Sequence, residues 1–387
     1  MRDSSSRRPG LDLARNLAIF LVIVQHIVFL GGLTNDGMGE LHRLQARLLE
    51  ALSQSCVDLF GLISGYLGVS ACGWKVRKFA RLWFQVWTTG LLVLGGCALA
   101  ALAFPAVFPE GLPTRADWFT AACPLLRDEY WYFTGYLFVF LLGPLINRGL
   151  FAAGRERIGL TVAAVLFVVV CGTTVCPGGV TWLPLAKGYS AAWLVCLYVF
   201  GAALRITESR WGAIRARWFF AATAACVAAT VLQRLSMASV PAIKTFFADE
   251  WTLHHYTSPT VTLGAVGLLL GCARLPLTAC RGRLARISTA LAPCAFGVYL
   301  LHVQPFFFRH VIAGRFAFLD RVPDAFFAIA VLFTTAAAHL LFALGDAATR
   351  RVILSGISFS RFARRMPCPG SSSCARCSCK AVSPSLR

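Results

Sequence analysis

The chain has 387 residues, of which 57% are hydrophobic and only 14% are charged. Soluble domains carry about 25% charged residues, so this composition excludes an ordinary soluble protein. The net charge is +20, but the mean hydropathy of +0.67 and the apolar runs along nearly the whole chain indicate an all-α, polytopic integral membrane protein.

Ten apolar runs are long enough to predict about ten transmembrane helices. They lie near residues 13–32, 53–71, 79–104, 129–147, 158–176, 189–206, 218–236, 258–275, 289–312 and 323–348. The first is about 20 residues long, so we expect a membrane helix there and not a cleaved signal peptide. One transmembrane domain is expected over 1–349, followed by a basic, Cys- and Ser-rich tail over 350–387 that we expect to be disordered.

The basic residues predict the orientation of these helices. With the N-terminus inside, most of the 37 Lys and Arg residues fall in the inner segments and the tail. Cytoplasmic loops of membrane proteins are enriched in positive charge, so both termini are predicted to be cytoplasmic, in a multi-pass protein of the cell (plasma) membrane. Nucleic-acid binding is not expected, because no soluble module carries a basic face interleaved with aromatic residues.

The 15 cysteines do not form a recognisable metal site. Most are scattered in the apolar runs, where they are expected to pack helices. Four lie in the tail, at Cys368, Cys374, Cys377 and Cys379, without the two separated CxxC pairs that zinc sites favour. We therefore expect no metal.

Ionisable residues inside a bilayer are costly and are usually functional. Arg15 and His26 are eleven residues apart, which amounts to three helical turns and about 20°. They should share one helix face, roughly 16 Å apart along the axis, with Arg15 at the cytoplasmic surface and His26 near mid-bilayer. The alternatives are a positive-inside anchor for Arg15 and a hydrogen-bonded packing role for His26.

Asp58 and His302 are predicted to lie at a depth similar to that of His26. A carboxylate near a histidine would fix its tautomer and raise its basicity. Asp58 would otherwise be a residue of the outer interface, and His302 would bridge two helices through a hydrogen bond.

The densest basic stretch, Lys75–Arg81, predicts an anion site at the inner surface. Arg77 and Arg81 are four residues apart on one helical face, where two guanidinium groups can hold phosphates, with Lys78 between them. Binding of lipid headgroups is the alternative. Ser64 and Tyr66 lie nearby, and Gly65 between them is expected to allow close approach of helices.

Several of these residues form an ordered set of short motifs. The set comprises Arg15 and His26, Cys56–Phe60 with Ser64–Tyr66, Lys75–Arg81, Tyr130–Tyr136 with Pro144–Asn147, Tyr256–Pro259, and Gly297–His302. In this order the motifs resemble the membrane-bound acyltransferase 3 family, which includes surface-polysaccharide O-acetyltransferases. Residues 1–387 contain no fused periplasmic hydrolase-type domain, which some members carry, and no second catalytic pair within a helix can be matched.

The resemblance implies transfer of an acyl group, typically acetyl, from cytoplasmic acyl-CoA to a sugar hydroxyl. The acceptor would be a surface glycan or its lipid-linked precursor. Such a transfer needs a base, for which His26 is the best candidate, with Arg15, Asp58 and His302 as further catalytic candidates. Acyl-CoA would be held by Arg15 and by the group Ser64, Tyr66, Arg77, Lys78 and Arg81. Whether a covalent intermediate forms stays open.

Two other classes of function are compatible with these residues. Intramembrane His, Asp and Arg residues would also suit a proton-coupled transporter or flippase, although no inverted repeat of motifs is visible. A non-enzymatic membrane scaffold would use the same polar groups as interhelical contacts. Binding of acyl-CoA distinguishes the enzyme from a carrier. In a scaffold, replacing His26 would alter stability and leave any acetylation phenotype unchanged.

Overall fold

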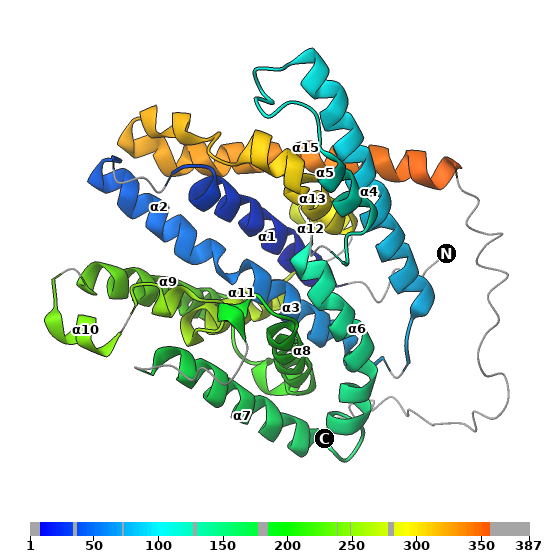
Figure 1. Cartoon of the computed structure of the whole chain (residues 1–387). Helices are drawn as coiled ribbons and strands as arrows, with labels where there is room; N and C mark the ends of the chain where they lie inside the picture. The colour runs from blue at the N-terminus through cyan, green and yellow to red at the C-terminus, as the bar shows by residue number, and fades with distance from the viewer. Residues whose placement is uncertain are drawn as a thin grey trace, which may run out of the picture.

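The computed structural model describes residues 8–33, 37–71, 73–126, 130–176, 185–237, 239–247, 249–277 and 282–356. Within these ranges the chain is helical and has no strand, which confirms the all-α prediction (Figure 1). The helices are α1 (Pro9–Gln25), α2 (Glu40–Ser53), α3 (Ser55–Gly68), α4 (Val76–Ala103), α5 (Arg115–Ala122), α6 (Trp131–Leu150), α7 (Glu156–Val175), α8 (Ala191–Ile206), α9 (Ala216–Met237), α10 (Pro241–Phe246), α11 (Pro259–Arg274), α12 (Arg283–Leu291), α13 (Ala295–Val303), α14 (Pro305–Phe307) and α15 (Phe327–Gly356). The predicted tail lies almost entirely outside the described residues.

Shorter helical segments connect or extend these helices. Two five-residue π-helical segments, His26–Leu30 and Phe308–Ile312, continue α1 and α14. Single 3₁₀ turns lie at Ala186–Gly188, Glu208–Trp211, Thr252–His254, Ala292–Cys294, Ala317–Arg321 and Asp324–Phe326.

In the described part of the chain, eight helical stretches are long and apolar enough to cross a membrane. They are Pro9–Leu30, Val76–Ala103, Trp131–Leu150, Glu156–Val175, Ala216–Met237, Thr252–Arg274, Arg283–Val303 and Asp324–Arg351. The predicted runs 53–71 and 189–206 fold into α3 and α8, which have 14 and 16 residues. At 1.5 Å per residue these two helices reach about 21 and 24 Å, which is short of a 30 Å hydrocarbon core.

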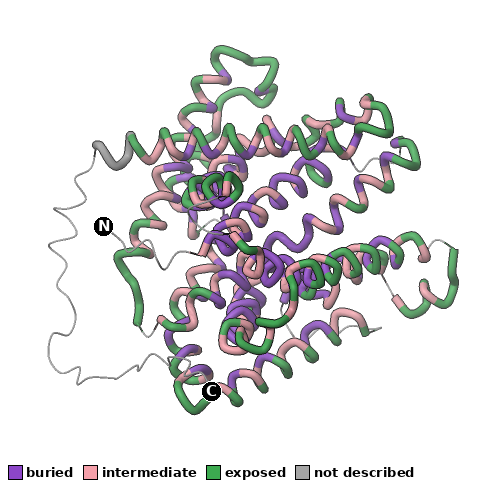
Figure 2. Tube along the Cα trace, turned by 180° about the vertical axis from the view of Figure 1, so that it is seen from behind, coloured by how far each residue is buried: buried purple, intermediate pink, exposed green. Residues whose placement is uncertain are grey.

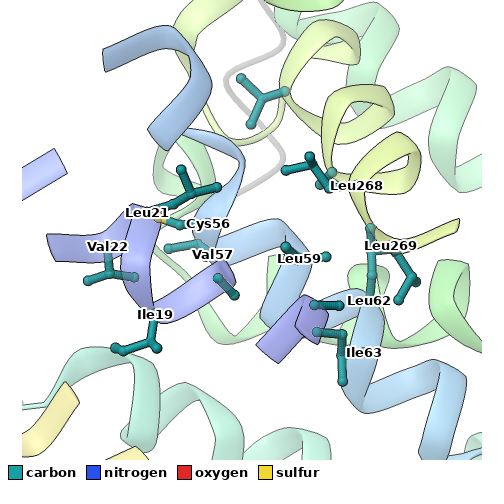
Figure 3. Packing of buried hydrophobic residues seen from close by; sticks show 14 of the residues in the cluster. Ile19, Leu21, Val22, Cys56, Val57, Leu59, Leu62, Ile63, Leu268 and Leu269 are labelled. Atoms are coloured by element: carbon teal, nitrogen blue, oxygen red, sulfur yellow. The ribbon is translucent and has the colours of Figure 1, made fainter. Parts of the chain in front are cut away.

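At the centre of the bundle α1, α3 and α11 pack on one another, and α8 packs on α3 (Figure 1). In the most apolar part of the Thr252–Arg274 span, which contains α11, 72% of the residues are buried. In the corresponding part of the Glu156–Val175 span, which is α7, 22% are buried. Figure 2 shows the same gradient from a buried centre to an exposed periphery. In Figure 3 the central side chains interdigitate, and those labelled are Ile19, Leu21, Val22, Cys56, Val57, Leu59, Leu62, Ile63, Leu268 and Leu269.

The contact between α3 and α8 brings the two backbones close together at Gly65. A Cβ atom added at Gly65 would lie 1.9 Å from the carbonyl oxygen of Tyr198 on α8. Small residues allow such close approach between apolar helices, where van der Waals packing replaces the hydrophobic effect as the main attraction. The prediction that Gly65 permits close helix approach is confirmed, and the contact fixes the position of Ser64 beside it.

Side-chain caps define where two of the central helices begin. Ser190 accepts a hydrogen bond from the backbone N–H of Trp193 at the start of α8. Ser258 does the same for Val261 at the start of α11, where Pro259 supplies a preset φ angle. Tyr189 directly precedes Ser190, and Tyr256 lies two residues before Ser258, so both tyrosine side chains project from backbone next to a capped helix start.

One end of the bundle carries a group of ion pairs centred on Glu208. Its carboxylate pairs with Arg8 and Arg205, and its carbonyl oxygen accepts a hydrogen bond from Arg274 at 2.7 Å. These residues join the ends of α1, α8 and α11. We call this the basic end, defined by Arg8, Arg15, Arg205 and Arg274.

Candidate active site

A cavity of about 710 Å³ runs along α1 between the central and peripheral helices. Its walls come from α1, α3, α4, α6 and α13, together with the segments before α8 and α11. Arg15 and His26 both line it, so the shared helix face predicted from their spacing is confirmed. Because the two residues are eleven positions apart on one helix, the cavity extends at least roughly 16 Å along α1.

The mouth of the cavity near the basic end is positively charged. Arg15, Lys75 and Lys78 line it together with Trp74, whose indole N–H donates to the carbonyl oxygen of Leu141 at 2.9 Å. The guanidinium of Arg15 is held by the carboxylate of Asp12 one turn away, at 3.3 Å. Three cations at one mouth make a binding place for an anion such as a phosphate.

The backbone at this mouth is fixed by an amide side chain from α6. Asn147 donates hydrogen bonds to the carbonyl oxygens of Gly68 and Ala71, at 2.9 and 2.8 Å. Its own carbonyl oxygen accepts from the hydroxyl of Tyr198 at 3.1 Å. Gly68 and Ala71 line the cavity, so Asn147 holds the segment that leads into Trp74 and Lys75.

At the other end of the cavity, His26 contacts a second histidine. The ring centroids of His26 and His302 are 5.1 Å apart, and the ring of Phe308 lies edge-on to His26 at the same distance. Nδ1 of the buried His302 ring donates to the carbonyl oxygen of Val298 at 2.6 Å. That bond leaves Nε2 of a neutral His302 as a hydrogen-bond acceptor. Neither His26 Nδ1 nor His302 Nε2 has a hydrogen-bond partner within the described ranges.

His26 stands where α1 changes from α-helical to π-helical hydrogen bonding. Such single turns are frequent at functional sites, because they displace one side chain from the regular helical face. The end of this turn is fixed by two backbone bonds, from Gly314 N–H to Leu30 and from Phe316 N–H to Gly31, both at 2.9 Å. These bonds join the end of the first π-helical segment to the chain that follows the second one.

Asp58 has a different environment from the one expected for a partner of a histidine. Its side chain is fully buried, and Oδ1 accepts a hydrogen bond from the indole N–H of Trp193 at 3.0 Å. Trp193 belongs to α8 and is itself fully buried. Asp58 therefore joins α3 to α8, and it lies outside the wall of the cavity, unlike its neighbours Cys56 and Val57.

The residues predicted to hold acyl-CoA divide into two groups. Ser64 and Lys78 line the cavity. Tyr66 is buried beneath the guanidinium groups of Arg8 and Arg205, whose central carbons lie 5.9 and 5.4 Å from the ring centroid. Arg77 and Arg81, called here the exposed arginine pair, lie on the outer surface of α4 and do not line the cavity.

Lys75 and Gln25 line the cavity but were not assigned to the site from the sequence. Lys75 completes the basic mouth, and its place in the dense basic stretch was the available signal. Gln25 lines the deep end beside His26, but a lone amide in an apolar run carries no distinctive pattern. An aromatic wall is formed by Trp131, Tyr132, Tyr136, Tyr189, Tyr256 and Tyr299. In the described residues, no cluster of three or more His, Cys, Asp or Glu side chains has the arrangement of a metal site.

The described part of the chain is thus a bundle of apolar helices around a cavity with a cationic mouth and a histidine pair at its other end. A family model described as an acyltransferase domain matches residues 8–343, and the chain therefore belongs to the acyltransferase 3 family. The protein is an acyltransferase, as the motifs of the sequence indicated, and its apolar helices make it a membrane protein. No curated protein and no solved structure matches the chain.

Proposed function

We propose that the protein transfers an acetyl group from cytoplasmic acetyl-CoA to a sugar hydroxyl of a cell-surface polysaccharide or its lipid-linked precursor. The observation that carries this proposal is the single cavity that joins Arg15, Lys75 and Lys78 at one end to His26 at the other. The phosphates of acetyl-CoA suit the cationic end, and a neutral sugar hydroxyl suits the end that carries His26.

The topology that we propose places the basic end in the cytoplasm of a cell with this protein in its plasma membrane. All ten predicted apolar runs coincide with helices, and α3 and α8 would cross inside the ring of longer helices. Because α3 and α8 are largely buried by neighbours, they do not need the full length of a lipid-facing helix. Both termini would then be cytoplasmic, in agreement with the distribution of Lys and Arg.

The donor would enter through the basic mouth. Its phosphates would bind Arg15, Lys75 and Lys78, and the extended pantetheine arm would cover the roughly 16 Å to His26. The exposed arginine pair adds positive potential outside the mouth, where it would increase the rate of donor capture. The aromatic wall offers the ring faces on which a sugar can stack.

In the proposed reaction, His26 accepts the proton of the sugar hydroxyl as the oxygen attacks the thioester carbonyl carbon. The carbon–sulfur bond then breaks, and the proton passes from His26 to the departing thiolate. The products are the O-acetylated sugar and CoA with a free thiol. His302 would orient His26, because its free Nε2 can accept an N–H from the neighbouring ring.

Mass analysis of surface glycans from cells with and without the gene tests this function. We expect acetyl groups on the glycan only when the wild-type gene is present, and a loss of them with His26→Gln. His42→Gln is the matched control, since His42 is a buried histidine on α2 outside the cavity. Purified protein that binds no acetyl-CoA, together with an unchanged glycan, would contradict the proposal and favour a carrier.

A further inference from the structure

A buried polar network lies next to His26 at the deep end of the cavity. It consists of Gln25 on α1, Gln54 between α2 and α3, Cys56 on α3 and Tyr256 before α11, all buried. The side-chain amide of Gln25 is its centre. Gln25, Cys56 and Tyr256 line the cavity, whereas Gln54 lies behind them.

The hydrogen bonds of Gln25 can be counted atom by atom. Nε2 donates one hydrogen to Oε1 of Gln54 at 2.7 Å and the other to the phenol oxygen of Tyr256 at 3.2 Å. Oε1 accepts from the thiol of Cys56 at 3.2 Å. These three bonds use both amide hydrogens and the amide oxygen of Gln25.

The phenol hydrogen of Tyr256 is the part of this network that a ligand can use. Its oxygen is also 3.3 Å from Oε1 of Gln25, so the hydrogen can be donated there. When an acyl oxygen occupies the cavity, the hydrogen can turn to it without leaving a buried group unsatisfied. The Gln25 oxygen still accepts from Cys56, and the Tyr256 oxygen still accepts from the Gln25 amide. A donor held in this way needs little reorganisation when charge develops.

We propose that Tyr256 donates a hydrogen bond to the carbonyl oxygen of the thioester and stabilises the negative charge that forms on it, with Gln25 as its positioning residue. This inference rests on the proposed acyl transfer. As the sugar oxygen bonds to the carbonyl carbon, the electron pair of the C=O double bond moves to its oxygen. When the carbon–sulfur bond breaks, that pair returns, and Tyr256 keeps its proton throughout. Removing one such donor typically costs about 10²–10³-fold in rate.

Tyr256→Phe removes the hydroxyl and keeps the ring that packs against Tyr189 at 5.0 Å between centroids. Tyr130→Phe is the matched control, because Tyr130 is equally buried, and its hydroxyl donates to the carbonyl oxygen of Leu300 outside the cavity. We expect kcat to fall about 10²-fold in Tyr256→Phe with little change in acetyl-CoA affinity, and to change less than threefold in the control. Gln25→Glu, which cannot donate to the phenol oxygen, should lower kcat by about 10-fold.

The infrared stretch of bound acetyl-CoA, labelled with ¹³C at its carbonyl, reads the contact directly. A hydrogen bond lowers this frequency, so Tyr256→Phe should raise it relative to both the wild type and Tyr130→Phe. If wild-type enzyme binds and transfers acetyl while Tyr256→Phe matches Tyr130→Phe in rate and frequency, the role of Tyr256 is refuted and the proposed function stands. Wild-type protein that neither binds nor transfers acetyl would overturn both.

Discussion

Replacing His26 with Gln keeps a polar side chain of similar length in the cavity but removes the nitrogen that accepts a proton near neutral pH. General-base catalysis contributes about 10²–10⁴-fold, so we expect kcat to fall at least about 10²-fold, or about 2.7 kcal/mol in the barrier. A packing role predicts that Gln is tolerated.

His302 refines this prediction, because its ring lies 5.1 Å from that of His26 and its Nε2 has no hydrogen-bond partner in the part of the chain that the structure describes. If His302 acts only by orienting His26, its loss should matter only while His26 is present. We expect His302→Gln alone to lower kcat by about 10-fold and the double variant to equal His26→Gln. That difference from additivity is a coupling of about 1.4 kcal/mol, which is typical of residues in contact.

The assay is the rate of glycan acetylation in membranes with equal amounts of folded protein, with acetyl-CoA binding measured in parallel. Additive losses would give His302 a role independent of His26. Near-normal acetylation by His26→Gln would remove His26 from the mechanism and make His302 the next base to test.

Three further predictions concern the walls of the cavity. The double variant Lys75→Ala, Lys78→Ala should raise the KM for acetyl-CoA by about 10-fold or more, and by more than alanine at both residues of the exposed arginine pair, because only the lysines line the mouth. If kinetic assays gave equal effects for the two double variants, the phosphates would bind outside the cavity. Asp58→Asn should retain an acceptor for the buried indole of Trp193 and remain active, whereas Asp58→Leu should lose about 1–3 kcal/mol of stability in thermal unfolding in detergent. A large loss of kcat with normal stability in Asp58→Asn would instead make this residue catalytic. Gly65→Ala should lower the free energy of unfolding by about 1–3 kcal/mol because it forces α3 away from α8, whereas Gly96→Ala on α4, where a Cβ atom would meet open space, should be nearly neutral. Equal melting temperatures of the two variants would contradict the close contact between α3 and α8.

The apolar pattern was sufficient to place the helices, because each of the ten runs coincides with helical structure. Hydropathy alone did not distinguish lipid-facing helices from the shorter central ones. α3 and α8 are apolar because they are surrounded by protein, and their length is set by neighbouring helices and not by the bilayer. The breaks between α2 and α3 at Gln54 and between α12 and α13 at Ala292–Cys294 also gave no clear signal in the sequence.

Helical geometry predicted the part of the site that belongs to a single helix. The helical periodicity of α1 puts Arg15 and His26 on one face of the helix, independently of the neighbouring helices, and this face lines the cavity. Contacts between helices were harder to predict, because depth in a membrane does not determine direction. Asp58 and His302 were expected at one level, yet His302 meets His26 and Asp58 turns to Trp193 on α8. Gln25 gained its importance only through partners from three other segments.

The turn that leads into Tyr189 has strained backbone. Ala186 and Lys187 have φ angles of 46° and 57°, and Gly188 follows at 103°. Left-handed conformations cost about 1–3 kcal/mol for residues other than Gly, so tertiary contacts must maintain this turn. A Cβ atom at Gly188 would lie 2.3 Å from the Cβ of Tyr256, and the turn therefore brings Tyr189 tightly against Tyr256.

Tyr189 leaves this strained turn as a half-exposed ring, with centroids 5.1 Å from Trp131 and 5.0 Å from Tyr256. Tyr189 belongs to the irregular segment before α8 and borders both Trp131 and Tyr256 of the aromatic wall, so we expect it to contact the acceptor. Aromatic contacts contribute about 0.5–1.5 kcal/mol, and Tyr189→Ala should therefore raise the KM for the glycan about 2–10-fold. The KM for acetyl-CoA should stay unchanged, as should the affinity for acetyl-CoA alone. A rise confined to the donor KM would place Tyr189 on the pantetheine path and assign the acceptor to another wall.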